Sequence, residues 1–298
     1  MNEILRVSVF GAGVFGGYHA TKVSAHDRAE IVCVYDPDTV AAEALAERFR
    51  GRSASSAAEA IAECDAVICA VPAVYHKTVC VPALADGRHL LVEKPLADSA
   101  EAARAILAAK GADTVLQVGH QERVVAEAIG LHRIPERPQS VEIVRHMGRT
   151  ARNTDTSIVM DMMIHDLDLL LGLYGSAAWA QAETRRSVYT DHADVVKAEI
   201  GFGDFTAYAS ASRDAEPERY WKLRYASGSV EIDFNAKTLR HDTPFDLDAD
   251  FGSQSAVKDS LAAAFDRFVS ACLDGGAPLA TGQDGLAAVL LAEMIEGT

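Results

Sequence analysis

The chain has 298 residues, 49 % of them hydrophobic, which is enough for two domains with cores of their own. Its formal net charge of −15 at pH 7 argues against nucleic acid or an anionic membrane as the main partner. The sequence opens without the basic and apolar regions of a secretory signal, and no apolar run reaches the roughly 18 residues of a membrane span. We therefore expect a cytoplasmic protein.

The first third of the chain alternates short apolar runs with segments of helical spacing. The predicted strands are Leu5–Phe10, Ile31–Tyr35, Ala66–Val71, Leu90–Val92 and Val115–Val118. The helices predicted between them cover 14–25, 38–50, 76–85 and 98–111. This alternation indicates right-handed βαβ units and a doubly wound parallel sheet of the Rossmann type, within an α/β protein. We predict that residues 1–120 form this first domain.

Glycines at positions 11, 13 and 16 form a GxGxxG pattern between the first predicted strand and helix. Such a pattern permits a tight turn, close approach of a pyrophosphate and close packing of helix on strand. A glycine turn that serves packing alone would look the same. However, Asp36 closes the second predicted strand, about 20 residues beyond Gly16. A carboxylate there accepts hydrogen bonds from both ribose hydroxyls and repels a 2′-phosphate, so the pair of features predicts NAD rather than NADP.

Past residue 120 the pattern changes to strands that follow one another directly. A helical stretch near 121–132 and a strand at Ser140–His146 precede a long helix over 159–175. Alternating segments follow at 182–190, 194–202, 205–213, 218–226 and 229–234, and two helices near 256–273 and 283–296 end the sequence. We predict that 121–298 is a second, α+β domain with a largely antiparallel open sheet. A second subunit often covers one face of such a sheet, so a homodimer or homotetramer is expected.

Three charged side chains share one face of the helix predicted over 159–175. At 100° per residue Asp161, His165 and Asp168 align, and Asp161 and His165 form an i,i+4 pair. A carboxylate next to an imidazole raises its proton affinity, which suits a general base. From spacing alone, a hydrogen-bonded structural histidine explains the pair at least as well, and Asp168 is expected to be structural. Asp166 points about 140° from Asp161 and no second histidine cluster is present, so we predict no metal.

Lys94 follows the fourth predicted strand in the segment LLVEKPLA. Ligands of open parallel sheets bind at the carboxyl ends of the strands. An ammonium group there can hydrogen-bond a substrate hydroxyl and stabilise the oxyanion that develops as a hydride leaves. A surface lysine paired with Glu93 is an equally good interpretation of these residues alone.

Arginines precede the 159–175 helix in an otherwise acidic chain, at positions 145, 149 and 152. Guanidinium forks suit a diphosphate, and arginines at the mouth of a site would attract an anionic substrate. Solvated loop arginines that pair with surface acids are an equally good interpretation of these residues.

Taken together, the motifs resemble those of the Gfo/Idh/MocA oxidoreductase family, which are NAD(P)-dependent dehydrogenases of sugars, polyols and related compounds. The resemblance rests on GAGVFG, Asp36, HLLVEKP, VGHQER at 118–123 and DxxxH at Asp161 and His165, and it covers essentially the whole chain. VGHQER and DMMIHDLDLLL are most similar to the branch that acts on UDP-N-acetylglucosamine at its 3-hydroxyl. The resemblance implies that Lys94, Asp161 and His165 are catalytic and that the Lys94–Pro95 peptide is cis.

Two sets of binding residues complete the prediction. The residues predicted to bind NAD are Gly11, Gly13, Val14, Phe15, Gly16, Asp36, Val71, Pro72, His76, Glu93, Lys94 and Gln121. Those predicted to bind substrate are Lys94, Arg123, Arg149, Arg152 and His165. The predicted reaction is oxidation of a secondary hydroxyl of a sugar or nucleotide sugar. The alternatives are a non-catalytic NAD-binding regulator of the same fold and a metal-dependent hydrolase that uses the HDxD cluster.

Overall fold

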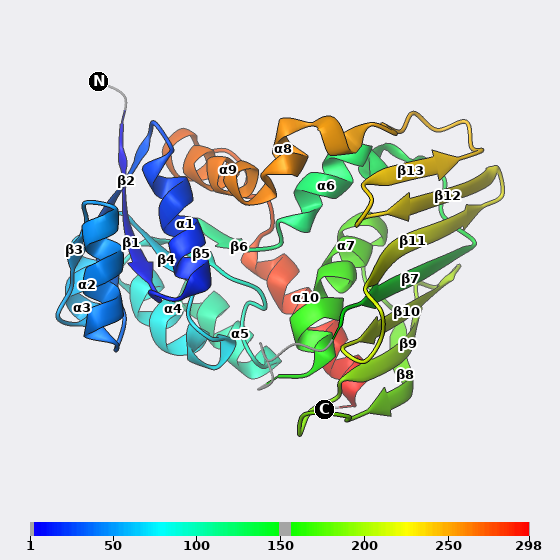
Figure 1. Ribbon diagram of the computed structural model, residues 1–298, viewed down its shortest axis with the longest axis horizontal. Helices are drawn as coiled ribbons and strands as arrows, with labels where there is room; N and C mark the ends of the chain where they lie inside the picture. Colours follow the sequence, from blue (N-terminus) through cyan, green and yellow to red (C-terminus); the bar gives the residue numbers. More distant parts are fainter. Residues whose placement is uncertain (1–2, 149–155, 298) are drawn as a thin grey trace. The chain divides into compact units, whose positions relative to one another are not determined.

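The computed structural model describes residues 3–148 and 156–297, which form two compact units (Figure 1). Unit 1 contains Met1–Gln121 and Asp259–Leu286, and unit 2 contains Glu122–Lys258 and Ala287–Thr298. The sequence predicts a boundary at residue 120, with 259–286 in the second domain. In the structure, the segment 259–286 belongs to unit 1.

The sheet of unit 1 has six parallel strands in the order β3-β2-β1-β4-β5-β6. This is the strand order of the Rossmann fold, so the prediction of a doubly wound sheet is confirmed. A two-residue edge strand, β3, adds to the five strands predicted from apolar runs. The strands are β1 (Leu5–Phe10), β2 (Ala29–Tyr35), β3 (Arg52–Ser53), β4 (Ala66–Cys69), β5 (His89–Val92) and β6 (Leu116–Val118).

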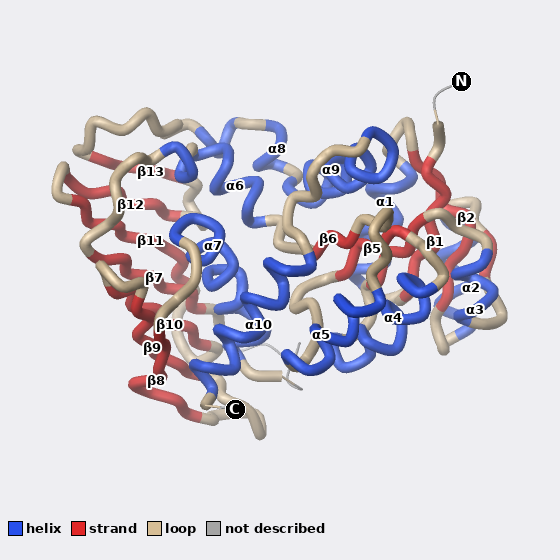
Figure 2. Tube along the Cα trace, turned by 180° about the vertical axis from the view of Figure 1, so that it is seen from behind, coloured by secondary structure: helices blue, strands red, loops and turns tan. Residues whose placement is uncertain are grey.

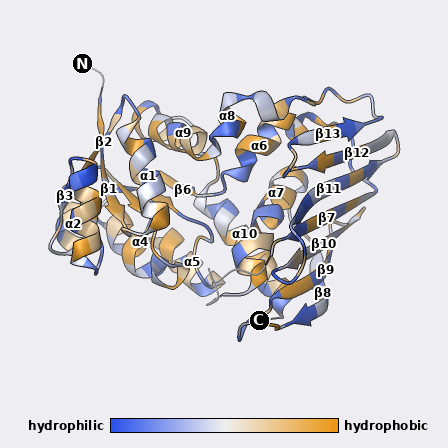
Figure 3. Ribbon diagram, viewed as in Figure 1, coloured by the Kyte–Doolittle hydropathy of each residue, from blue (hydrophilic) through white to orange (hydrophobic). Residues whose placement is uncertain are grey.

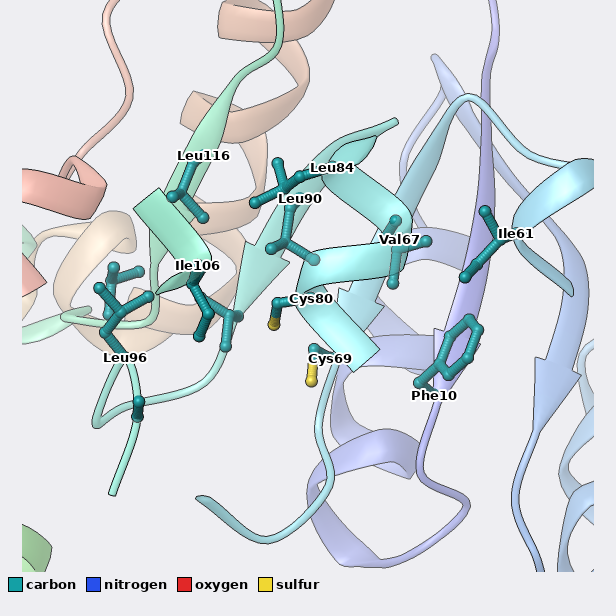
Figure 4. Close-up of a cluster of buried hydrophobic side chains, with 14 of the residues drawn as sticks. Phe10, Ile61, Val67, Cys69, Cys80, Leu84, Leu90, Leu96, Ile106 and Leu116 are labelled. Atoms are coloured by element: carbon teal, nitrogen blue, oxygen red, sulfur yellow. The ribbon is translucent and has the colours of Figure 1, made fainter. Parts of the chain in front are cut away.

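Helices cover both faces of this sheet, and each face has its own apolar core. One face packs against α1 (Val14–Ser24), α2 (Thr39–Arg48) and α9 (Ser260–Asp274). The other packs against α3 (Ala57–Ala62), α4 (His76–Ala85) and α5 (Ala100–Ala109). Figure 4 shows the second core, in which Phe10, Cys69, Cys80, Leu84, Leu90 and Ile106 are fully or almost fully buried. A parallel sheet buried on both faces explains why its strands are continuous apolar runs.

The return of 259–286 to unit 1 has a packing reason. Phe265 and Phe268 of α9 are buried in the core that contains Leu5 and Val7. The buried Gln117 side chain donates from Nε2 to the carbonyl of Ala264 at 2.8 Å, and its Oε1 accepts from the backbone N–H of Leu279 at 2.9 Å. These contacts join segments about 150 positions apart in the chain, which no local pattern reveals.

Unit 2 contains a seven-stranded sheet in the order β13-β12-β11-β7-β10-β9-β8. β7 and β10 are parallel, and all other neighbours are antiparallel. Short turns at Gly203-Asp204 and Ala226-Ser227 join β9 to β10 and β11 to β12. The strands are β7 (Ser140–His146), β8 (Trp179–Arg186), β9 (Val195–Gly201), β10 (Thr206–Ser212), β11 (Glu218–Tyr225), β12 (Gly228–Asp233) and the unpredicted β13 (Thr238–His241).

The two faces of this sheet differ. On the inner face Ile143 and Trp221 are buried beneath α7 (Ile164–Tyr174), whose Asp166 accepts a hydrogen bond from the Trp221 indole. The outer face alternates with it in register, and Glu142 and Tyr208 lie exposed on it. Figure 3 colours the strands of this sheet by hydropathy, and both hydrophilic and hydrophobic residues lie along them. Within the described residues, no helix of unit 2 lies against this outer face (Figures 1 and 2).

Further turns and helices lie between and after these elements. They are the 3₁₀ turns at Ala73–Tyr75, Leu131–Arg133 and Phe251–Ser253, and helices α6 (Glu122–Ile129), α8 (Ser255–Lys258) and α10 (Gly282–Glu296). None of the helices in the described part of the chain is long and apolar enough to cross a bilayer.

Candidate active site

The glycine loop after β1 packs so closely on neighbouring backbone that two of its positions have no room for a side chain. Gly11 has φ of +98°, and a β-carbon there would lie 2.6 Å from the carbonyl oxygen of Ala70. A β-carbon at Gly16 would collide with the carbonyl of Gly11, so α1 packs directly on the end of β1. At Gly13, the residue before α1, an added β-carbon would meet nothing within 4 Å. The loop therefore leaves open space at a helix N-terminus, which fits a pyrophosphate.

Asp36 follows β2 and is fixed by two backbone hydrogen bonds. Its Oδ2 accepts from the N–H of Ala12 in the glycine loop at 2.7 Å, and its Oδ1 accepts from the N–H of Asp38 at 2.8 Å. Each carboxylate oxygen can accept more than one hydrogen bond, so both retain capacity for a ribose diol. The acid and the glycine loop are thus one connected structure, which fits the adenosine half of a dinucleotide.

Glu93 and Lys94 follow β5, and the Lys94–Pro95 peptide is cis, as the family resemblance implies. The Glu93 carboxylate lies 2.6 Å from Nε2 of the buried His19 on α1, and it also accepts from the N–H of Lys94 at 3.3 Å. Burial raises the pKa of Glu93, but the hydrogen bond and charge of His19, together with the Lys94 ammonium, hold it below its usual value. A negative charge is therefore maintained next to Lys94.

His76 joins two of the loops at this edge of the sheet. It is buried, with Nδ1 2.9 Å from the carbonyl of Pro95 and Nε2 3.0 Å from that of Val71. Burial lowers the pKa of His76, which favours the neutral ring. Each ring nitrogen lies beside a backbone carbonyl, and a neutral ring donates to one of the two, so His76 links the loop after β4 to the loop after β5.

The predicted cofactor residues come together at one edge of the sheet in unit 1. They follow the carboxyl ends of five parallel strands: the glycine loop with Val14 and Phe15 after β1, Asp36 after β2, Val71, Pro72 and His76 after β4, Glu93 and Lys94 after β5, and Gln121 after β6. This is the edge at which open α/β sheets bind ligands.

The helix that carries DxxxH differs from its prediction at its first turn. Residues Val159–Met163 form a π-helix, and α7 continues from Ile164. The N–H of Ile164 bonds to the carbonyl of Val159, an i→i−5 contact, so the 100° spacing assumed from sequence does not hold around Asp161. Such wide turns are frequent at functional sites. Asp161 and His165 are both buried, with exposed fractions of 5 % and 8 %.

Each of the three aspartates on this helix binds its own arginine in unit 2. Arg145 of β7 contacts both oxygens of Asp166, from Nε at 2.5 Å and from Nη2 at 3.0 Å. Arg123 of α6 contacts both oxygens of Asp168, from Nε at 2.8 Å and from Nη2 at 2.6 Å. Asp161 accepts a hydrogen bond at its Oδ2 from Nη2 of the buried Arg213, at 3.2 Å.

These pairs bear on the predicted substrate residues. The guanidinium of Arg123 lies against Asp168, and Arg145 is buried against Asp166 rather than exposed in a loop. The binding role of Arg123 stays a prediction. Arg149 and Arg152 lie outside the described residues. Among the described residues, no three His, Cys, Asp or Glu side chains are grouped so as to hold a metal ion.

Three residues of these networks were not predicted from sequence: His19, Asp194 and Arg213. His19 lies three positions after Gly16, and a polar residue on the sheet-facing side of an apolar helix is a signal that could have found it. Arg213 contacts Asp161, and Asp194 contacts Arg213, with no sequence spacing that indicates either contact.

Comparisons with known proteins agree with this geometry. A family model described as an oxidoreductase family with an NAD-binding Rossmann fold matches residues 5–120. The chain is 33 % identical over 243 residues to a UDP-N-acetylglucosamine 3-dehydrogenase of Acidithiobacillus ferrooxidans, which covers 79 % of this chain and 76 % of that protein. It is 34 % identical over 192 residues to an inositol 2-dehydrogenase of Corynebacterium glutamicum, covering 59 % of this chain and 56 % of that protein.

Solved structures extend the likeness to the whole chain. The Acidithiobacillus ferrooxidans UDP-N-acetylglucosamine 3-dehydrogenase superposes with a TM-score of 0.88 at 30 % identity, over 98 % of this chain and 97 % of that one. A dehydrogenase from Bordetella pertussis, solved with NADH and UDP-GlcNAcA, has the same fold, with a TM-score of 0.88 at 20 % identity over 100 % of this chain and 96 % of that one. By its glycine loop, its sheet order and these relatives, the chain belongs to the Gfo/Idh/MocA family of NAD-binding oxidoreductases.

Proposed function

We propose that this enzyme oxidises UDP-N-acetylglucosamine at its 3-hydroxyl with NAD as hydride acceptor. The observation that carries the substrate assignment is the likeness to the Acidithiobacillus ferrooxidans UDP-N-acetylglucosamine 3-dehydrogenase, which holds over almost the full length of both chains. The glycine loop and Asp36 in unit 1 and the buried Asp161 and His165 in unit 2 support the reaction class.

The proposed roles follow from the chemistry of each side chain. His165 takes the proton of the reacting hydroxyl, and Asp161 stabilises the imidazolium that results. Lys94 hydrogen-bonds the same oxygen and stabilises its developing negative charge. NAD, when bound, accepts the hydride from the carbon. The alcohol thus loses a proton to His165 and a hydride to the cofactor, and becomes a ketone.

We also propose that the open sheet of unit 2 forms a homo-oligomer contact. Its outer face carries Tyr208, which is 47 % exposed, and Tyr220, whose hydroxyl donates to Glu142 at 2.7 Å. The Lys222 ammonium lies 4.6 Å from the centre of the Tyr220 ring. A face of aromatic side chains with locally paired charges suits a contact between identical subunits.

Replacing Asp36 with alanine should narrow the preference for NAD over NADP. The wild-type enzyme should bind NAD more tightly, because the Asp36 carboxylate accepts hydrogen bonds from the ribose diol and repels a 2′-phosphate. The variant should lose affinity mainly for NAD. Calorimetric titration of both proteins with both cofactors measures this, and equal wild-type affinities would remove Asp36 from its assigned role.

The substrate assignment is tested by a screen of NAD reduction. UDP-N-acetylglucosamine should be turned over in preference to free N-acetylglucosamine, glucose and myo-inositol. Arg149→Ala and Arg152→Ala should raise KM for the nucleotide sugar more than they lower kcat, as expected for uniform binding of a diphosphate. Turnover of myo-inositol alone would favour the reaction of the inositol 2-dehydrogenase relatives. Tight NAD binding with no turnover of any compound would favour a regulator.

A further inference from the structure

We propose that Arg213 and Asp194 are positioning residues for the reaction. They form a buried Asp194–Arg213–Asp161 cluster, which holds the Asp161 carboxylate where it stabilises the protonated imidazole of His165. The inference rests on the proposed function, because it assumes that His165 is the base. Neither residue lies in the DxxxH motif. Arg213 follows β10 and Asp194 precedes β9. Both belong to unit 2, as does the helix that carries DxxxH, which is called the site helix below and consists of the π-helix Val159–Met163 and α7.

The Arg213 guanidinium binds three separate parts of unit 2. Its Nη2 donates to Oδ2 of Asp161 at 3.2 Å. Its Nη1 donates to Oδ1 of Asp194 at 3.2 Å and to the carbonyl of Thr156, just before the π-helix, at 3.1 Å. All three charged side chains are at most 5 % exposed, so their contacts are not screened by solvent. One planar side chain therefore sets the position of the first turn of the site helix.

Asp194 is itself held firmly. Its carboxylate accepts from the backbone N–H groups of Val188, Tyr189 and Thr190 at 2.7 to 3.0 Å, and from the Thr190 hydroxyl at 3.0 Å. Burial raises the pKa of Asp194, but these hydrogen bonds outweigh it and hold the pKa well below its usual value. Asp194 is thus an ionised anchor that fixes the far side of Arg213.

The other two aspartates of the site helix show what is different about Asp161. Asp166 and Asp168 are each gripped through both oxygens by an arginine fork, which neutralises their charge locally. Arg213 contacts Asp161 through one nitrogen, Nη2, while its Nη1 contacts Asp194. The negative charges of Asp161 and Asp194 favour a proton on His165, so loss of the Asp194 charge should weaken the binding of that proton.

Other charged groups face the same helix from the elements packed against it. They are Glu122 and Arg123 of α6, Arg145 of β7, and Arg219 of β11, which contacts Glu122. These groups form ion pairs with one another or with Asp166 and Asp168. A change of charge at Asp194 therefore acts on Asp161 through Arg213, which contacts both residues.

The test compares Arg213→Lys and Asp194→Asn with the wild-type enzyme, using NAD and UDP-N-acetylglucosamine. Lysine keeps the charge but cannot hold both aspartates in one plane, so Arg213→Lys should lower kcat about 10-fold with an unchanged Kd for NAD. In Asp194→Asn, the charge of Arg213 is no longer shared with an ionised residue at position 194, so it interacts more strongly with Asp161. The proton affinity of His165 should therefore fall. The low-pH limb of kcat/KM should therefore move to lower pH.

A double variant and a matched control give the test its specificity. The shift caused by Asp194→Asn should largely vanish in an Asp161→Asn background, because the effect acts through Asp161. The control is Arg219→Lys, which replaces the guanidinium of an arginine whose side chain is 22 % exposed and which pairs with Glu122. Because neither residue of that pair lies on the site helix, the variant should leave both kcat and the pH profile unchanged. Additive shifts in the double variant, or equal losses in Arg219→Lys, would overturn the proposal.

Failure of the inference is distinguishable from failure of the proposed function. Titration of the histidine rings by NMR, with His165→Gln for assignment, needs no substrate, and Asp194→Asn should lower the pH at which His165 is half-protonated. If His165→Ala keeps full turnover, the proposed function fails. If His165→Ala is inactive but Asp194→Asn changes neither the NMR titration nor the pH limb, only the positioning role fails.

Discussion

We expect His165→Ala to lower kcat for sugar oxidation by about 10²- to 10⁴-fold, the range that general-base catalysis supplies. The Kd for NAD should stay close to the wild-type value, because the cofactor loop belongs to unit 1 and His165 to unit 2. Single-turnover kinetics and calorimetric titration measure the two quantities separately. A loss confined to kcat would indicate an interaction made in the transition state.

A matched histidine controls for the substitution itself. His241 lies in β13 of the same unit, is exposed, and pairs with Thr243 at 2.9 Å, so His241→Ala should keep wild-type kcat. The pH profile adds a second check. The wild-type rate should fall at low pH as the base becomes protonated, and Asp161→Asn should move that limb to lower pH. Wild-type turnover by His165→Ala would place the base elsewhere, with Lys94 the first residue to examine.

The parts of the fold that could be predicted from sequence are those set by local chemistry. Strands buried on both faces need continuous apolar runs, and the chain must bend sharply after β1, which at Gly11 requires a positive φ. The structure brings the glycine loop and Asp36 to one edge of the sheet, and their binding of NAD stays a prediction. β3 escaped prediction because two residues carry no periodicity.

The site helix shows where local reasoning fails. Its pattern predicted a helix with Asp161 and His165 in i,i+4 register, but the π-turn at Val159–Met163 changes the angular spacing at Asp161. Nothing in the residue pattern signals that turn. The arginines that bind the aspartates come from α6, β7 and the end of β10, so their partners depend on how the chain is packed in unit 2. Arg145, one of the three arginines noted before this helix, is buried in β7, whereas the role of Arg149 and Arg152 stays a prediction.

We expect Lys94→Met to be almost as severe as loss of His165, with kcat lowered by about 10²- to 10³-fold, the usual effect of removing one preorganised donor to a developing oxyanion. Methionine retains most of the length and the apolar stem of lysine but has no charge. The Lys94 N–H bonds to the Glu93 carboxylate, which is in turn held by His19, so the variant should keep the position of this loop. Because Lys94 is also predicted to bind NAD, the Kd for NAD is measured beside kcat, and the larger change should fall on kcat.

Lys77→Met is the control for Lys94→Met. Lys77 lies on α4 of the same unit, is about half exposed, and has only a 3.9 Å ion pair with Glu101, so its replacement should change neither kcat nor KM. Lys94→Arg should keep part of the activity, because the charge remains while the compact ammonium geometry is lost. If Lys94→Met instead raises KM for the sugar and leaves kcat intact, the ammonium binds the ground state and transition state equally, and the oxyanion must be stabilised by another group.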